Sequence, residues 1–446
     1  MRERRYLSRM TVTAPNPVLD FGDAAVLDGG LSAMARGLRG SIILGIAAQV
    51  REYAATGRPF CNLTVGDFDP RQFPVPAPLR ELAIGAIERG ETNYPPSDGV
   101  LALREAVAAY IAREHSVDLP VASVLVTAGG RPAIYAAFRC IVDPGDAVLF
   151  AVPSWNNDYY AEMVGARQIV VRSRAERSFQ PTRGELEPHL SQVKLLCLCS
   201  PGNPTGTLLP PDGLREILQA VVLENERRAS RAQAPLFVLH DLMYGSLVFG
   251  DRPHAHPLAL VPEAAPWVVT IDGISKAFAA TGLRVGWVTA APAVIARLKD
   301  FLGHVGAWAP RPEQIATAAF LRDAAAIAEF RRAMNTALWQ RLDALYSGFM
   351  ALRQQGFPVN SVRPEGAMYL SLQLDLVGRN VGGVVPRDNE AVRALLLDRA
   401  GLAAVPFQAF GLPEESGWFR LSVGAVSLED IAAMLPRIER LMHEVK

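Results

Sequence analysis

Short apolar segments alternate with longer helical patterns through the middle of the chain, and this alternation limits the folds that are open to it. Seven apolar runs bounded by turn residues are strand candidates, at 124–127, 147–150, 168–171, 195–199, 236–240, 268–272 and 285–289. Helical patterns lie between them, for example at 132–142 and 214–228. Strands that alternate with helices predict a mostly parallel sheet that carries helices on both faces.

The pattern changes after residue 291, where a mainly helical stretch begins and continues to residue 349. Strand candidates then return at 367–372 and 418–423, with helices expected at 389–400 and 427–445. Because 446 residues exceed one average domain, we expect about two domains. We assign an N-terminal arm to 1–30, a small α+β domain from both chain ends to 31–75 and 316–446, and a large α/β domain to 76–315.

Charge and composition exclude several classes of partner. Lysine plus arginine and aspartate plus glutamate both number 45, so nothing favours nucleic acid or an anionic membrane. No segment approaches the ~18 uninterrupted apolar residues of a membrane span, and the N-terminus lacks the apolar stretch of a secretory signal. The four cysteines lack zinc spacing, and Cys197 and Cys199 share one face of a strand, which favours core residues over a redox pair. We expect a cytoplasmic protein without a metal site, nucleic-acid partner or membrane partner.

Lys276 is the residue on which the functional prediction depends. It stands among small and apolar residues after a strand candidate, in Gly-Ile-Ser-Lys-Ala-Phe-Ala-Ala-Thr-Gly-Leu-Arg-Val-Gly-Trp at 273–287. Burial would lower the pKa of its amine, and a neutral amine attacks carbonyl groups. Eight residues later, Arg284 is a fixed cation suited to a phosphate. This pair fits pyridoxal phosphate, which needs an amine for its aldehyde and an anchor for its phosphate. The competing interpretation is an ordinary surface lysine.

Two other strand candidates end in polar residues that suit the same cofactor. Asn203 lies in Ser-Pro-Gly-Asn-Pro-Thr-Gly at 200–206, a turn at the edge where open α/β sheets bind ligands. Asp241 follows the strand candidate at 236–240, with Tyr244 three residues later, and a buried aspartate can keep a pyridinium nitrogen protonated. Taken singly, Asn203 fits a turn residue better than a ligand, and Asp241 fits a helix or turn cap as well as it fits a cofactor contact.

Two adjacent glycines, Gly129 and Gly130, separate the strand candidate at 124–127 from the helix that follows it. They would expose backbone N–H groups at the helix N-terminus, where the macrodipole favours an anion. The alternative interpretation is a Gly-Gly turn without a ligand.

Together, these motifs resemble the aminotransferase class I/II family of fold-type I pyridoxal phosphate-dependent enzymes, to which aspartate aminotransferases belong. Ser-Pro-x-Asn-Pro-Thr-Gly, Asp-x-x-Tyr, Ser-Lys and Gly-x-Arg-x-Gly occur in the family's order, at 200–206, 241–244, 275–276 and 282–286. The resemblance extends from about Leu31 to the C-terminus and includes 62–67, 93–99, 126–130 and 419–422. It implies the fold-type I architecture and an aminotransferase that moves an amino group between an L-amino acid and a 2-oxo acid.

The resemblance also implies roles for the matching residues. Lys276 would form an aldimine with the cofactor and then shuttle a proton, Asp241 would pair with the ring nitrogen, and Tyr244 would bond the ring's O3′. Further cofactor contacts are implied for Tyr94, Gly130, Arg131, Trp155, Asn203, Ser275 and Arg284. For Trp155 the alternative is an ordinary core tryptophan, and for Ser275 it is a polar turn residue.

Substrate and partner contacts follow from the same resemblance. Arg420 matches the arginine that grips the substrate α-carboxylate, with help from Asn203 and the Gly66 backbone. In the family the tyrosine that matches Tyr94 reaches the phosphate from the partner subunit. The resemblance therefore implies a homodimer with shared active sites.

The chain also departs from the family pattern in its loops. Gly-Asp-Phe-Asp-Pro at 66–70 replaces the common Gly-Glu-Pro-Asp-Phe, and Phe407 follows Val-Pro where a small residue is common. Gly273 stands where a hydroxyl residue is often found three places before the lysine. We expect these departures to affect substrate shape and to leave the reaction class unchanged.

Arg131 suggests the class of substrate. It follows Gly130 at the position where aspartate-specific members of one subgroup carry a lysine that contacts the distal carboxylate. We therefore expect aspartate or glutamate as donor and 2-oxoglutarate as acceptor, with Arg311 as a second cation near the partner's site. The alternatives are that Arg131 caps a helix or pairs with a surface acid. Other reactions on this scaffold also stay open: β-elimination, or a cyclising or oxidising biosynthetic step.

Overall fold

The computed structural model describes residues 19, 21–38, 40–250 and 254–446, and the chain divides into two units, 1–39 and 40–446. The first unit contains two short helices, α1 (Ala24–Gly29) and α2 (Ala33–Gly37). The N-cap side chains of Asp23 and Ser32 accept hydrogen bonds from the first turns of these helices. The arm predicted at 1–30 lies partly outside the described residues, and its boundary stays a prediction.

A seven-stranded sheet lies at the centre of the second unit, with the strand order β2-β8-β7-β6-β5-β3-β4. Strands β3 to β7 run parallel to one another, and β8 is antiparallel to both of its neighbours. Each of the seven predicted strands is present within two residues of its predicted ends, as β2 (Val124–Thr127), β3 (Ala147–Val152), β4 (Arg167–Arg172), β5 (Leu195–Cys199), β6 (Phe237–Asp241), β7 (Val268–Gly273) and β8 (Gly286–Thr289). The predicted α/β fold with a mostly parallel sheet is confirmed.

Both faces of this sheet are buried, which explains why most of its strands are continuous apolar runs. Successive residues enter different cores: Leu196 and Leu198 of β5 pack in one, and Leu195 and Cys197 in the other. The first core includes residues of α4 (Ala77–Glu88), α5 (Leu101–His115), α8 (Arg183–Leu190), α9 (Pro211–Ala229), α10 (Pro257–Leu260), α11 (Ile274–Ala277) and α13 (Arg311–Leu321). The other core includes residues of α3 (Ile42–Ala54), α6 (Gly130–Ile141), α7 (Asn157–Val164) and α12 (Pro292–Val305).

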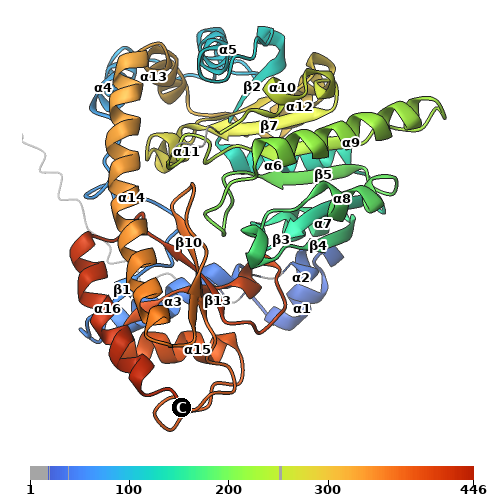
Figure 1. Ribbon diagram of the computed structural model, residues 1–446. Coiled ribbons are helices and arrows are strands. Elements are labelled where there is room, and N and C mark those ends of the chain that lie inside the picture. Colours follow the sequence, from blue (N-terminus) through green and yellow to red (C-terminus); the bar gives the residue numbers. More distant parts are fainter. Residues whose placement is uncertain (1–18, 20, 39, 251–253) are drawn as a thin grey trace, which may run out of the picture. The chain divides into compact units, whose positions relative to one another are not determined.

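A further core lies between a four-stranded antiparallel sheet, β12-β13-β10-β9, and three helices. The strands are β9 (Val359–Ser361), β10 (Tyr369–Leu374), β12 (Val405–Pro406) and β13 (Trp418–Ser422), and the helices are α14 (Ala324–Gln354), α15 (Asn389–Leu395) and α16 (Leu428–His443). In Figure 1, α14 runs from the neighbourhood of α4 and α13 past β10 toward α16.

Segments from near the start and from near the end of the second unit's sequence pack together in this region. Strand β1 (Cys61–Asn62) pairs in parallel with β11 (Leu402–Ala403), so the segment that leads to Gly66 lies beside the C-terminal part of the chain. This pairing agrees with a small domain built from both ends, although its boundaries at 75 and 316 stay predictions. Strands β1, β9, β11 and β12 were not predicted, because each has only two or three residues and such a short segment cannot show a period of two.

One predicted helix differs from the structure at its end. The pattern at 389–400 forms an α-helix only as far as Leu395, and Leu396–Ala400 continues as a π-helical turn. Gly401 ends the turn with a φ of 63°, a left-handed conformation that glycine adopts without strain. The predicted helix at 427–445 is α16, which begins with a capping box between Ser427 and Asp430.

Two absences hold for the part of the chain that the structure describes. None of its helices combines the length and apolar character needed to cross a bilayer. Its His, Cys, Asp and Glu side chains form no group able to hold a metal ion.

Four histidines come from neighbouring elements: His115 ends α5, His240 lies in β6, and His254 and His256 lie just before α10. We call these four residues the histidine cluster. The His115 ring centroid is 5.4 Å from that of His256 and 6.3 Å from that of His254. Burial lowers the pKa of His240 to about 3 and that of His254 to about 4, and it also lowers the pKa of His115 and of His256. The folded chain therefore holds the cluster uncharged near neutral pH.

We expect the cluster to make the protein less stable in acid. Its folded-state pKa values lie below the unfolded value of about 6.5, so the unfolded chain binds more protons as the pH falls from there toward 4. Over this range the wild type should lose free energy of unfolding more steeply than His240→Leu, because the variant lacks one of the titrating groups. The difference in slope should be about 1 kcal/mol per pH unit. Urea unfolding at several pH values measures this slope, with the exposed His304→Leu as control. Identical slopes in both variants would contradict this account.

Candidate active site

The ends of several strands meet at one edge of the seven-stranded sheet. Strand β8 is antiparallel to β2 and to β7, so the end of β2 and the start of β8 lie at the same edge as the carboxyl ends of the parallel strands. A cavity of about 430 Å³ is present there, as expected for the ligand site of an open α/β sheet. Its lining includes every predicted site residue except Tyr94, namely Gly66, Gly130, Arg131, Trp155, Asn203, Asp241, Tyr244, Ser275, Lys276, Arg284 and Arg420.

Lys276 lies in α11, directly after β7. Its Nζ donates a hydrogen bond to the Gly66 carbonyl at 2.7 Å and is 3.8 Å from Oδ1 of Asp67. Burial lowers the pKa of Lys276 to about 8, although the Asp67 carboxylate opposes this shift. A significant fraction of the amine is then neutral near neutral pH and can act as a nucleophile.

The backbone before Lys276 has no room for a side chain at Gly273. A Cβ atom there would lie 2.7 Å from the Val285 carbonyl oxygen, on the neighbouring strand. In this chain, glycine is therefore the residue that fits at position 273 without a shift of the backbone.

Asp241 is the last residue of β6 and is fixed by the turn that follows it. Its Oδ1 accepts a hydrogen bond from the Met243 backbone N–H at 2.9 Å. Burial raises the pKa of Asp241 to about 6. A bound cation beside this carboxylate would stabilise its charged form, and the carboxylate would stabilise the cation in return.

The N-terminus of α6 and Arg284 form a cradle for an anion. Gly129, the N-cap of α6, has a φ of 86° and offers no side-chain cap to the first turn. Arg284 donates to the carbonyls of Thr281 at 2.7 Å and Ala128 at 3.0 Å, which fixes its guanidinium beside this turn. A Cβ atom on Gly129 would lie 2.5 Å from Arg284 Nη2, and one on Gly286 would lie 2.8 Å from the Gly129 carbonyl carbon. Both glycines are therefore required for the cradle to close.

A buried polar network connects Arg420 to Tyr244. Arg420 is 1% exposed and donates to Oδ1 of Asn203 at 3.2 Å and to the Thr64 carbonyl at 2.7 Å. Because arginine only donates, Asn203 must direct its oxygen toward Arg420 and its Nδ2 toward the Tyr244 hydroxyl, 3.3 Å away. The Tyr244 hydroxyl is in turn 2.7 Å from that of Tyr369.

One hydrogen-bond donor of Arg420 is unpaired among the described residues. Its guanidinium carbon lies 4.7 Å from the Tyr369 ring centroid and 4.9 Å from that of Phe410. Its buried Nε has no hydrogen-bond partner among the described residues. A buried cation with an unpaired donor beside a cavity is suited to a carboxylate ligand.

Arg131 extends from the first turn of α6 to the ring of Trp155. The distance from its guanidinium carbon to the Trp155 ring centroid is 4.7 Å, a cation–π contact. No carboxylate in the described part of the chain forms an ion pair with Arg131, so the expected alternative of a surface ion pair finds no support there. Arg311 differs in this respect, because its Nε donates to Glu91 at 2.7 Å.

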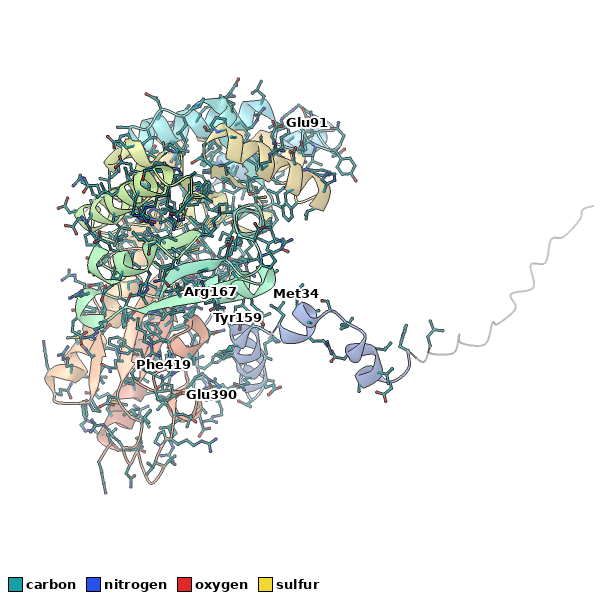
Figure 2. All side chains as sticks on the ribbon, turned by 90° about the vertical axis from the view of Figure 1, so that its right-hand side faces the viewer. Met34, Glu91, Tyr159, Arg167, Glu390 and Phe419 are labelled. Atoms are coloured by element: carbon teal, nitrogen blue, oxygen red, sulfur yellow. The ribbon has the colours of Figure 1, made fainter. Side chains whose placement is uncertain are left out.

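Tyr94 lies outside the cavity. Its side chain is 82% exposed, and its ring packs edge-on against Trp308 with a centroid distance of 5.3 Å. Figure 2 shows Glu91, three residues before Tyr94, at the surface of the second unit and far from Phe419 of β13.

The cavity lining also includes residues that the sequence interpretation did not assign to the site: Ile43, Leu44, Asp67, Ile134, Met243, Thr281 and Tyr369. The most connected of them is Tyr369, which begins β10 and bonds Tyr244. Nothing in the local sequence around Tyr369 marks it as a site residue. Asp67 lies both in the matching segment 62–67 and in the departing loop 66–70, and neither motif assigns a role to its side chain.

Known proteins resemble this chain over nearly its whole length. The family model for aminotransferase class I and II matches residues 58–438. An aspartate aminotransferase from Streptomyces avermitilis is 32% identical over 424 residues, which cover 93% of this chain and 97% of the relative. An aspartate/prephenate aminotransferase from Thermus thermophilus is 30% identical over 420 residues, covering 93% and 99%. The solved structure of aspartate aminotransferase from Thermus thermophilus with maleate has a TM-score of 0.80 at 28% identity, covering 92% of this chain and 99% of that one.

Proposed function

The chain belongs to the aminotransferase class I and II family, and from this premise we propose that it uses pyridoxal 5′-phosphate, bound through Lys276, to move an amino group between an acidic L-amino acid and a 2-oxo acid. The observation that carries this proposal is the lining of one cavity by Lys276, Asp241, Arg284 and the N-terminus of α6. The family is known for this cofactor, and these groups match its aldehyde, ring nitrogen and phosphate.

The chemistry of each group supports the fit. The lowered pKa of Lys276 favours a covalent bond to an aldehyde, and the buried Asp241 favours a protonated ring nitrogen. Arg284 and the backbone N–H groups of α6 favour a phosphate. When bound, the cofactor supplies an electrophilic carbon and an electron-withdrawing ring. Ser275 and Trp155 complete the proposed cofactor contacts.

Once freed from its covalent bond, Lys276 is the group that would move a proton. Its Nζ has the Gly66 carbonyl and Asp67 as neighbours, which hold the amine at the cavity. A base with a pKa of about 8 can both take and return a proton near neutral pH. Tyr244 and Asn203 would orient the ring oxygen through the network that ends on Arg420.

The cations support an acidic substrate. Arg420, whose Nε has no partner among the described residues, would bind the α-carboxylate. Arg131, which pairs with no carboxylate in the same part of the chain, would bind a distal carboxylate. The relatives named aspartate aminotransferase, and the one solved with the dicarboxylate maleate, support the same assignment. Gly66 and Arg420 come from the proposed small domain, 31–75 and 316–446, and the cofactor contacts come from the proposed large domain, 76–315.

An amino-group transfer to the cofactor can be tested without an acceptor. Adding L-aspartate or L-glutamate to the holoenzyme should release about one equivalent of the matching 2-oxo acid per site, and the visible absorbance of the bound cofactor should fall. Lys276→Ala should slow this step by at least about 1000-fold, since it removes the proton-transfer group. The matched control is Lys299→Ala, a lysine that pairs with Asp98 outside the cavity. Continuous oxo-acid formation with ammonia release would instead indicate another reaction class.

The role of Arg131 predicts a selective loss. Arg131→Ala should lower kcat/KM for L-aspartate by roughly 10- to 100-fold, the scale of a charge-assisted hydrogen bond. It should leave L-alanine, which lacks a distal carboxylate, nearly unchanged. Arg183→Ala is the control, because this cation pairs with Glu187 on α8, outside the cavity. Equal losses for both substrates in steady-state assays would contradict the assignment.

We further propose a homodimer in which Tyr94 serves the partner's site. Tyr94 contacts Trp308, three residues after the end of α12, and exposed apolar side chains occur on the elements that flank this contact: Ile84 and Ile87 of α4, and Val305 at the end of α12. Such exposure supports a protein contact at this surface. A tyrosine that is 82% exposed is also free to reach a second subunit.

Subunit mixing tests this arrangement. Tyr94→Ala and Lys276→Ala should each be impaired as pure dimers. Mixed dimers would contain one intact site, so dissociation and reassociation of equal amounts should restore roughly a quarter of wild-type activity. Sedimentation gives the oligomeric state. If Tyr94 served its own subunit, the mixture would recover no activity.

A further inference from the structure

Tyr369 is held in the cavity by the turn that carries Asn203. Its side chain is 1% exposed, and Ser371, two residues later on β10, donates to the Thr205 carbonyl at 2.9 Å. Gly206 has a φ of 71°, and a Cβ atom there would lie only 2.0 Å from the Tyr369 carbonyl oxygen. The start of β10 and the 203–206 turn therefore pack backbone against backbone, so the Tyr369 ring has a fixed place beside Tyr244.

Among the described residues, the Tyr244 hydroxyl oxygen has two hydrogen-bond partners. Nδ2 of Asn203 is a donor only, so it occupies one acceptor position of the Tyr244 hydroxyl at 3.3 Å. The Tyr369 hydroxyl, at 2.7 Å, is the other neighbour and can either donate or accept. A tyrosine hydroxyl has one proton and two acceptor positions. The direction of the bond to Tyr369 therefore decides where the Tyr244 proton points.

When a ligand oxygen that can accept a hydrogen bond occupies the cavity, the available partners favour one direction of the bond between Tyr244 and Tyr369. Among the described residues, the Tyr369 hydroxyl has Tyr244 as its one hydrogen-bond partner. If Tyr244 donated to Tyr369, the Tyr369 proton and the ligand's oxygen would both lack a partner. If Tyr369 donates to Tyr244, every proton and acceptor is satisfied, because the Tyr244 proton is free to point into the cavity. Buried polar groups strongly favour the fully paired arrangement.

We propose that Tyr369 is a positioning residue for Tyr244: by donating its hydroxyl proton to the Tyr244 oxygen, it directs the Tyr244 proton toward the ring oxygen of the bound cofactor. This inference rests on the proposed function and goes beyond it, because it gives a role to a residue that touches Tyr244 and Arg420. The Arg420 guanidinium carbon lies 4.7 Å from the Tyr369 ring centroid, a cation–π contact that further fixes the ring.

Tyr369→Phe isolates this role, because it keeps the ring and its contact with Arg420 and removes one oxygen. The readout is the pH midpoint at which the visible absorbance of the bound cofactor changes. A proton donated to the ring oxygen stabilises its negative charge, so the Lys276 nitrogen bonded to the cofactor holds its own proton less tightly. Tyr244→Phe should therefore raise the midpoint, and Tyr369→Phe should raise it by a smaller amount, on the order of 0.5 pH unit.

The double variant distinguishes positioning from an independent effect. If Tyr369 acts through Tyr244, then Tyr244→Phe/Tyr369→Phe should have the midpoint of Tyr244→Phe alone. Tyr110→Phe is the matched control: it removes another buried hydroxyl, which contacts Ser246, and should leave the midpoint unchanged. Thermal unfolding of the cofactor-free variants checks that each is folded.

Three results would overturn the inference. An unchanged midpoint in a coloured Tyr369→Phe protein, or a Tyr369→Phe shift that persists in full in the Tyr244→Phe background, would reject it alone. A wild-type protein that binds no pyridoxal phosphate would reject this inference and the proposed function together.

Discussion

Burial of the central sheet on both faces is the constraint on which the site depends. A charged side chain in the middle of such a strand would lose its hydration without gaining a partner. The charged residues of the site therefore come at or after the ends of strands, as Asp241 does on β6 and Lys276 does after β7. Polar residues that do occur within strands are neutral: Thr270 and Thr289 bond each other, and His240 stays uncharged.

The cavity gathers more positive than negative side chains, although the chain as a whole has no net charge. Lys276, Arg131, Arg284 and Arg420 face Asp67 and Asp241. The imbalance is local, so it attracts anionic ligands without making the protein a general binder of polyanions. Lys276 lies 3.8 Å from Asp67, whereas the three arginines are positioned by carbonyls, rings and an amide, contacts that leave each guanidinium charge available to an anionic ligand.

A feature could be predicted from the sequence when the residues that form it are close together in the chain. The seven strands of the central sheet were predictable because each is a local apolar run, and the cavity residues that carry motifs follow those strands directly. Tyr369 was missed because it reaches Tyr244 only through packing between β10 and the 203–206 turn, more than 160 residues apart in the chain. The end of the helix predicted at 389–400 was missed because the apolar pattern cannot distinguish an α-helix from a π-helical turn.

Helix α14 belongs to two cores at once. Among its 31 residues, Ile327 near the N-terminal end packs in the core on one face of the central sheet, and residues from Leu338 to Leu352 pack in the core of the smaller sheet. The two cores therefore share one continuous set of backbone hydrogen bonds. Melting either end of α14 exposes apolar surface in one core and weakens the helix that the other core packs against. We therefore expect the two cores to unfold cooperatively, and a ligand bound in the cavity to protect both of them from proteolysis.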